Sequence, residues 1–165
     1  MTEIQMVDEN ELNILIKSMG DVYLTLLPGY KENIYQQALS TEFTLHNTPH
    51  SLEVVVPILY KGYYVGFERA DIVLYAGQNP SAVIELKAQG VSLGKKEFNQ
   101  LSKYIHNLNL SVGYVVNFLN TTNKITEDNV LEYLEICKIQ DGVLYKFHSC
   151  SMNFQVYNYD FNIHY

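Results

Sequence analysis

The stretch RADIVLYAGQNPSAVIELKAQ, residues 69–89, decides the fold. Its two apolar runs, IVLY and AVI, are separated by the turn-forming residues GQNP, and this pattern is typical of two neighbouring buried strands. Charged residues gather at one end of the pair, where Asp71 precedes the first run and Glu85 and Lys87 follow the second. Burying a charge is costly unless it is paired or binds an ion. These three residues are therefore the first candidates for a functional site.

The rest of the chain shows helical and strand patterns on both sides of this hairpin. We expect helices where apolar residues recur at helical spacing, over residues 9–26, 31–46 and 96–109. We expect strands over residues 52–60, 63–75, 81–87, 111–118, 131–139, 142–148 and 152–165, with a tight turn at Lys61 and Gly62. The pattern predicts a single domain of mixed α/β type.

Length and composition narrow the class of protein. The chain has 165 residues, of which 47% are hydrophobic, and this is enough for one compact domain with its own core. No run approaches the roughly 18 to 20 apolar residues that a membrane-spanning helix needs. The N-terminus is acidic and lacks an apolar signal region, and Cys137 and Cys150 form no CxxC motif and no metal-spaced set. We therefore expect an intracellular protein, cytoplasmic or nuclear, with reduced thiols.

The charge of the chain argues against one class of nucleic-acid-binding protein. A net charge of −7 does not fit a protein that coats nucleic acid, because phosphate contacts need Lys and Arg. It is compatible with an enzyme that has a small basic patch. Arg69 is the only arginine beside ten lysines, and we weigh two roles for it, a phosphate contact and a structural ion pair. The many Asn, Ile and Tyr residues point to an AT-rich genome, cellular or viral.

The charged end of the hairpin has the chemistry of a metal site. Residues two apart in a strand share a face, so Glu85 and Lys87 point the same way, and antiparallel pairing would place Asp71 opposite them. Mg²⁺ is commonly bound by one or two carboxylates together with waters and phosphate oxygens. A lysine beside the metal can orient or deprotonate the attacking water. The alternative is a solvated Glu-x-Lys pair of no special function, which three residues alone do not rule out.

Two helices add further candidates. Gln100 and Tyr104 lie one turn apart on the helix that follows the third strand, so they can border the same site. Gln100 would bond a water or phosphate, and Tyr104 a phosphate oxygen or a base. Glu32 falls in the first turn of another helix, where the helix dipole favours a carboxylate in any case; its functional role would be that of a third acid facing the metal. For each helix the alternative is an ordinary solvent-facing charge or polar face.

Taken together, these motifs resemble the GxxExxY family of the PD-(D/E)XK nuclease superfamily. The resemblance runs over residues 8–120 and rests on four motifs in matching order, supported by the connecting V-P-I-x-Y-K-G stretch at 56–62. The motifs are G-x-x-E-x-x-Y (Gly29, Glu32, Tyr35), R-A-D (Arg69, Ala70, Asp71), E-L-K (Glu85, Leu86, Lys87) and Q-x-x-x-Y (Gln100, Tyr104). The family often has a histidine and a glycine just before Pro-Gly, where this chain has Tyr23 and Leu27.

The resemblance implies a fold and an activity. The fold would be restriction-endonuclease-like, a mixed sheet flanked by helices. The activity would be that of a nuclease, with DNA as the expected partner and Mg²⁺ or Mn²⁺ as the cofactor. The metal ligands would be Asp71, Glu85 and Glu32, and the catalytic residues Lys87, Glu32, Gln100 and Tyr104.

We keep a second interpretation from a different class. Residues 1–150 would form the nuclease-like domain, and the aromatic segment 151–165 would be an extension that adds a strand or contacts another subunit. On this view the protein is a catalytically silent binding or assembly module that keeps the nuclease fold. It would act as a homo-oligomer or as a subunit of a larger complex or particle.

Overall fold

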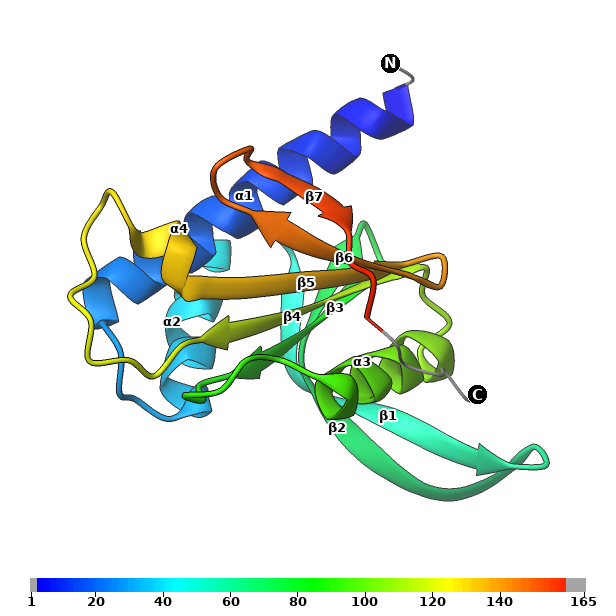
Figure 1. Ribbon diagram of the computed structural model, residues 1–165. Helices are drawn as coiled ribbons and strands as arrows, with labels where there is room; N and C mark the ends of the chain where they lie inside the picture. The colour runs from blue at the N-terminus through cyan, green and yellow to red at the C-terminus, as the bar shows by residue number, and fades with distance from the viewer. Residues whose placement is uncertain (1–2, 160–165) are drawn as a thin grey trace.

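The computed structural model describes residues 3–159, and it describes side chains from Asn13 onward. A seven-stranded sheet in the order β1-β2-β3-β4-β5-β6-β7 forms the centre of the molecule (Figure 1). The strands are β1 (His50–Tyr60), β2 (Tyr63–Ala76), β3 (Asn79–Lys87), β4 (Val112–Phe118), β5 (Leu134–Gln140), β6 (Val143–His148) and β7 (Asn153–Val156). The helices are α1 (Glu3–Leu26), α2 (Glu32–Leu45), α3 (Lys95–Asn107) and α4 (Val130–Tyr133).

The helices cover both faces of the sheet and create two apolar layers. Helices α1 and α2 contribute Met19 and Leu39 to a core that includes Leu74 of β2. Helix α3 contributes Phe98 to a second core that includes Val83 of β3. Strands β3 and β4 are parallel and are joined through α3, whereas the other neighbouring strands are antiparallel. The predicted mixed sheet flanked by helices is therefore confirmed.

Glycine allows α3 to lie close to the sheet. A Cβ atom at Gly113 of β4 would lie 2.8 Å from Ile105 of α3 and 2.8 Å from Val83 of β3, which is closer than side chains pack. Because Gly113 has no side chain, α3 can pack closely on β3 and β4, the two strands that it connects. This position matters for the site, because α3 carries Gln100 and Tyr104.

A buried asparagine holds the loop that leads from β3 to α3. Asn117 of β4 is fully buried and accepts a hydrogen bond from the Gln89 backbone N–H over 3.0 Å. Its amide donates to the Val91 carbonyl over 3.1 Å and to Glu135 over 3.3 Å. Glu135 in turn accepts a bond from the Leu93 backbone N–H. The loop is therefore bonded to the sheet at three points just before α3 begins.

Most of the predicted elements form, with differences at residues 130–133 and at the end of the last strand. The Lys61–Gly62 turn is present, and both residues have positive φ, as a two-residue hairpin turn requires. The predicted strand 131–139 is wrong at its start, because residues 130–133 form the short helix α4 and β5 begins at Leu134. The run V-L-E-Y fits a strand and a helical turn equally well. The bond from the Val130 N–H to the Thr126 carbonyl, over 3.0 Å, begins the helical turn.

The described part of the C-terminal segment joins the same sheet. Strand β7 pairs with β6, and the rings of Tyr157 and Tyr159 lie 6.3 and 5.2 Å from that of Phe98 on α3. The predicted strand 152–165 is wrong at residues 157–159, which leave the sheet where the rings of Tyr157 and Tyr159 pack on Phe98; residues 160–165 lie outside the described residues. The cysteines Cys137 and Cys150 are both free. None of the described helices has the length and apolar character needed to cross a membrane.

Candidate active site

The candidate site lies where β2 and β3 pair. The register aligns Ile72 with Ile84, so Asp71 lies opposite Glu85 on the neighbouring strand. The Asp71 backbone N–H donates to Glu85 Oε1 over 2.9 Å, and the Leu86 backbone N–H donates to Asp71 Oδ2 over 2.8 Å. Each carboxyl group is thus bonded to the backbone of the opposite strand. These bonds fix both acids at one point of the sheet.

Burial changes the protonation of this acid pair. Glu85 is only 4% exposed. Burial raises its pKa from 4.5 to about 9, and repulsion from Asp71 acts in the same direction, whereas Lys87 opposes the shift. Burial also raises the pKa of Asp71. In the absence of a cation, Glu85 therefore keeps a proton at neutral pH and shares a hydrogen bond with the Asp71 carboxyl group.

Two residues that the sequence analysis did not single out complete the acid cluster. Gln36 of α2 donates from Nε2 to Glu53 Oε1 over 2.8 Å and to the Asp71 carbonyl over 2.9 Å. Glu53 of β1 adds to the raised pKa of Asp71. A sequence signal existed for Gln36, which is a buried polar residue one helical turn after Glu32. The signal for Glu53 was an acid in the otherwise apolar run L-E-V-V-V.

On either side of these acids, the side chains of β1 and β2 pack in different apolar layers. Leu52 and its partner Ile72 pack in the α1–α2 layer, whereas Val54 and Ala70 pack in the α3 layer. In a regular strand, residues 52 and 54 would share a face. Between them, Glu53 has a φ of +53°, a left-handed conformation that is uncommon for residues other than glycine. Because of this local change in backbone direction, the side chains before Glu53 face the α1–α2 layer and those after it face the α3 layer.

The residues predicted on α3 lie on the same face as Lys87. Lys87 Nζ donates to Gln100 Oε1 over 3.2 Å, and Gln100 Nε2 donates to the Tyr104 hydroxyl over 3.1 Å. The Tyr104 hydroxyl donates to Glu68 Oε2 over 3.1 Å. Burial, Glu85 and Glu68 all raise the pKa of Tyr104. This hydroxyl therefore stays protonated at neutral pH and serves as a hydrogen-bond donor.

Glu32 approaches the site from the first turn of α2. Burial raises its pKa, Lys87 opposes that shift, and Asp71 adds to it. Glu32 also lines a hollow of about 430 Å³ together with Lys31, Asn33 and Ala88. Ala88 directly follows Lys87 in the chain, so this hollow lies next to the lysine of the site.

Tyr35 and Glu97 make structural contacts away from the acids. The Tyr35 hydroxyl donates to the Leu27 carbonyl over 2.6 Å and shapes the loop before α2. The Glu97 carboxylate accepts a bond from the Gly94 backbone N–H over 2.9 Å. Glu97 thus caps α3 and does not face the acids.

The acid cluster does not form a complete metal cage on its own. Within the part of the chain whose side chains are described, no three His, Cys, Asp or Glu residues converge closely enough to hold a metal ion. Asp71 and Glu85 are in direct contact, but Glu32 does not join them in such a group. Two carboxylates with waters and substrate oxygens are a common ligand set for Mg²⁺. Direct ligation by Glu32 stays a prediction.

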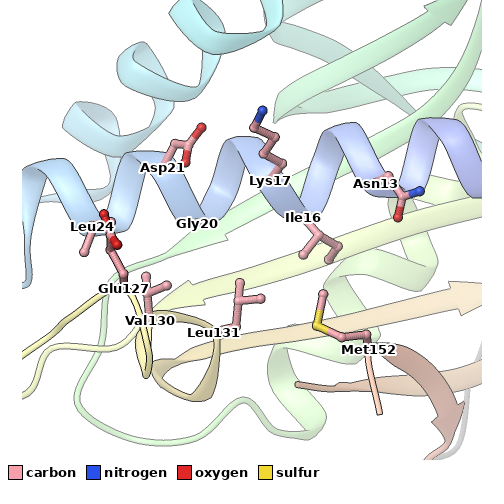
Figure 2. Close-up of a pocket in the computed structure, with 10 residues that line it drawn as sticks. All are labelled: Asn13, Ile16, Lys17, Gly20, Asp21, Leu24, Glu127, Val130, Leu131 and Met152. Carbon is pink, nitrogen blue, oxygen red and sulfur yellow. The ribbon is translucent and has the colours of Figure 1, made fainter. Parts of the chain in front are cut away.

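A second, apolar pocket lies apart from the acids. It has a volume of about 340 Å³ and is formed between α1 and the segment around α4 (Figure 2). Its apolar lining comes from Ile16, Leu24, Val130, Leu131 and Met152. None of the acid-cluster residues lines this pocket, so we assign it no part in the chemistry of the site.

The comparison with known families agrees with this geometry. Residues 9–127, well over half of the chain, match the family model of the PD-(D/E)XK nuclease superfamily. The match includes β2, β3 and α3 and therefore all the residues described in this site. No match is found among curated proteins.

Proposed function

The chain belongs to the PD-(D/E)XK nuclease superfamily, and from this premise we propose that it is a Mg²⁺-dependent phosphodiester hydrolase that acts on DNA. The observation that carries the proposal is the reciprocal bonding of Asp71 and Glu85, with Lys87 on the same face two residues later. Within the superfamily we place the chain in the GxxExxY family, because it has that family's motifs in order around Glu32, Asp71, Glu85 and Gln100.

The donor set fits a divalent cation. Asp71 and Glu85 each use one oxygen for a backbone N–H, and they hold a shared proton in a buried position. A cation with two positive charges can replace that proton, because its charge compensates for the burial and for the repulsion from Asp71 that keep Glu85 protonated. Mg²⁺ is the expected ion, and Mn²⁺ accepts the same oxygen ligands. When bound, the cation would neutralise charge on the scissile phosphate and lower the pKa of an attacking water.

The other residues would position the water and the phosphate. The Lys87 ammonium is held by Gln100 and lies near the acids, so it can activate the attacking water by orienting it. Gln100 and the protonated Tyr104 hydroxyl can donate to water or phosphate oxygens. Glu32 interacts electrostatically with Lys87 and Asp71, and it would hold metal-bound waters. Fixed donors of this kind act on charge that develops in the transition state.

Cleavage assays with a matched lysine control test the proposal. Plasmid DNA and linear single- and double-stranded DNA are incubated with Mg²⁺, with Mn²⁺ and with EDTA. We expect Lys87→Ala to reduce metal-dependent cleavage by about a hundredfold or more, and Lys124→Ala, at an exposed position, to leave it unchanged. Cleavage that survives both Lys87→Ala and chelation would remove this mechanism.

One observation favours the alternative of a silent module. The described side chains hold no metal cage of three ligands, so a chain that had lost catalysis could keep the same fold. Calorimetric titration with Mn²⁺ separates the two cases. Saturable binding that is lost in Asp71→Asn supports the enzyme, and the absence of binding together with the absence of cleavage supports the module. Assembly through residues 151–165 and an intracellular location stay predictions.

A further inference from the structure

The β1–β2 hairpin carries a large exposed apolar surface. It extends beyond the body of the molecule (Figure 1), and its tip and outer half expose the side chains Val55, Leu59, Tyr60, Tyr63, Tyr64, Val65 and Phe67. The exposed fraction of Tyr63 reaches 76%. Soluble proteins seldom expose apolar patches of this kind unless the patch binds something.

One face of this hairpin ends at Arg69, two residues before Asp71 of the acid cluster. Directly opposed residues of antiparallel strands share a face, and the register aligns Val55 with Arg69, Pro57 with Phe67 and Leu59 with Tyr64. The shift after Ile58, which leaves Val65 as an extra residue, keeps Tyr64 on the same face as Phe67. We call these six residues the outer face. The opposite face of the hairpin packs against α3 through Val54, Val56 and Ala70.

The outer face leads along one strand to the candidate metal ligand. Phe67 and Arg69 share the outer face, Asp71 follows Arg69 by two residues along β2, and at about 3.3 Å per residue Tyr64 lies roughly 23 Å along the strand from Asp71. A polymer bound along the outer face would therefore reach the acid cluster. A small-molecule substrate would have no use for a surface of this length.

The charge of the hairpin suits an anionic partner. Residues 54–67, which lie between Glu53 and Glu68, contain no Asp or Glu, although the whole chain has a net charge of −7. The two cations of the hairpin lie beside aromatic rings, with Lys61 Nζ 5.4 Å from the centre of the Tyr60 ring and the Arg69 guanidinium 5.7 Å from that of Phe67. Within the described residues Arg69 makes no ion pair, so the structural ion pair considered for it is absent there.

We propose that the outer face of the β1–β2 hairpin stacks unpaired bases, so that the substrate is a single strand or carries an unpaired segment. The inference rests on the proposed function, and it narrows the substrate class. Duplex affinity comes mainly from phosphate contacts with Lys and Arg, and this hairpin has one of each. Unpaired bases bind through stacking on exposed rings and need few cations. The outer face offers the rings of Tyr64 and Phe67 beside one guanidinium.

Ring-retaining and ring-removing variants test the stacking directly. Fluorescence anisotropy in EDTA measures binding of an oligothymidylate of about twenty nucleotides, an oligouridylate of the same length and a DNA duplex. In Tyr64→Leu/Phe67→Leu, apolar side chains remain but the rings are lost, and we expect single-strand affinity to fall about tenfold or more. In Tyr64→Phe/Phe67→Tyr both rings remain, and we expect affinity within about twofold of wild type. The wild type should bind at least one of the single strands more tightly than the duplex.

A second readout separates this inference from the proposed function. Hydrolysis of bis(p-nitrophenyl) phosphate with Mn²⁺ needs the acids but no base stacking, so both double variants should match the wild type. Absence of this hydrolysis in wild type would contradict the proposed function while the binding comparison still decides the inference. Equal affinity of the leucine and aromatic variants, or a preference for duplex, would overturn the inference. Light scattering provides a further test. If the wild type is a dimer, the leucine variant is a monomer and DNA binding is unchanged, the outer face joins two copies of the chain and the inference is overturned.

Discussion

Replacing Glu85 with glutamine should stabilise the metal-free protein while it removes the proposed cation site. In the fold, Glu85 has a pKa near 9, whereas its ordinary value is 4.5. Between these values the folded protein keeps a proton that the unfolded chain has lost. The free energy of unfolding therefore decreases as pH rises through this window, by about 1.4 kcal/mol per pH unit. The contribution of Glu85 to this free energy is fully present below pH 4.5 and is lost above pH 9.

The magnitude follows from the width of the window. At pH 7 the wild type should have lost on the order of 3 kcal/mol relative to its stability at pH 4.5. Glutamine has no proton to lose, so the advantage of Glu85→Gln should grow with pH up to about pH 9. Asp71, whose pKa burial also raises, leaves the variant a residual decline of the same sign.

Urea unfolding in EDTA at several pH values checks this reasoning. The matched control is Glu127→Gln, at an exposed loop position, which should follow the wild-type curve. Addition of Mg²⁺ at pH 8 should then stabilise the wild type by about 3 kcal/mol at a hundredfold excess over the Kd, and it should leave Glu85→Gln unchanged. A wild-type stability that stays flat between the two pKa values would refute the buried proton on which the argument depends.

Three other changes have outcomes that stability and exchange measurements can check. Gly113→Ala places a methyl group 2.8 Å from Ile105 and Val83, and should lower the free energy of unfolding by about 1 to 3 kcal/mol in urea titrations. Leu27, exposed and at a φ of +67°, should tolerate glycine with no loss of Tm, whereas the β-branched Leu27→Val should lower Tm. Asn117→Ala removes the acceptor of the Gln89 N–H, so hydrogen exchange of that amide should become faster, and a rate equal to that of wild type would contradict the bonding described for the loop.

The core of the site could be predicted from the sequence because it is local. Asp71 and Glu85 lie on consecutive strands joined by a short turn, and the two-residue period of a strand is enough to place Lys87 beside them. The Gln100–Tyr104 pair could be predicted for the same reason, because α3 directly follows β3 in the sequence. The positive φ of Leu27 also gives a physical reason why the family often has glycine at that position.

Local patterns marked Gln36 and Glu53 as unusual residues, but they could not place either of them at the site. Gln36 reaches Asp71 only because α2 packs across the sheet from a distant part of the sequence. Glu53 reaches the cluster through a left-handed backbone that its residue type does not favour. The short helix α4 was missed because its four residues have no period long enough to separate a helix from a strand.

The layer change at Glu53 gives the hairpin and the acids a mechanical connection. The same two strands form the projecting arm on one side of this point and hold the carboxyl groups on the other, with no linker in between. A bend or twist of the projecting arm would therefore change the spacing of Asp71 and Glu85 directly. The arm and the proposed cation site are thus one structural unit and could not vary independently.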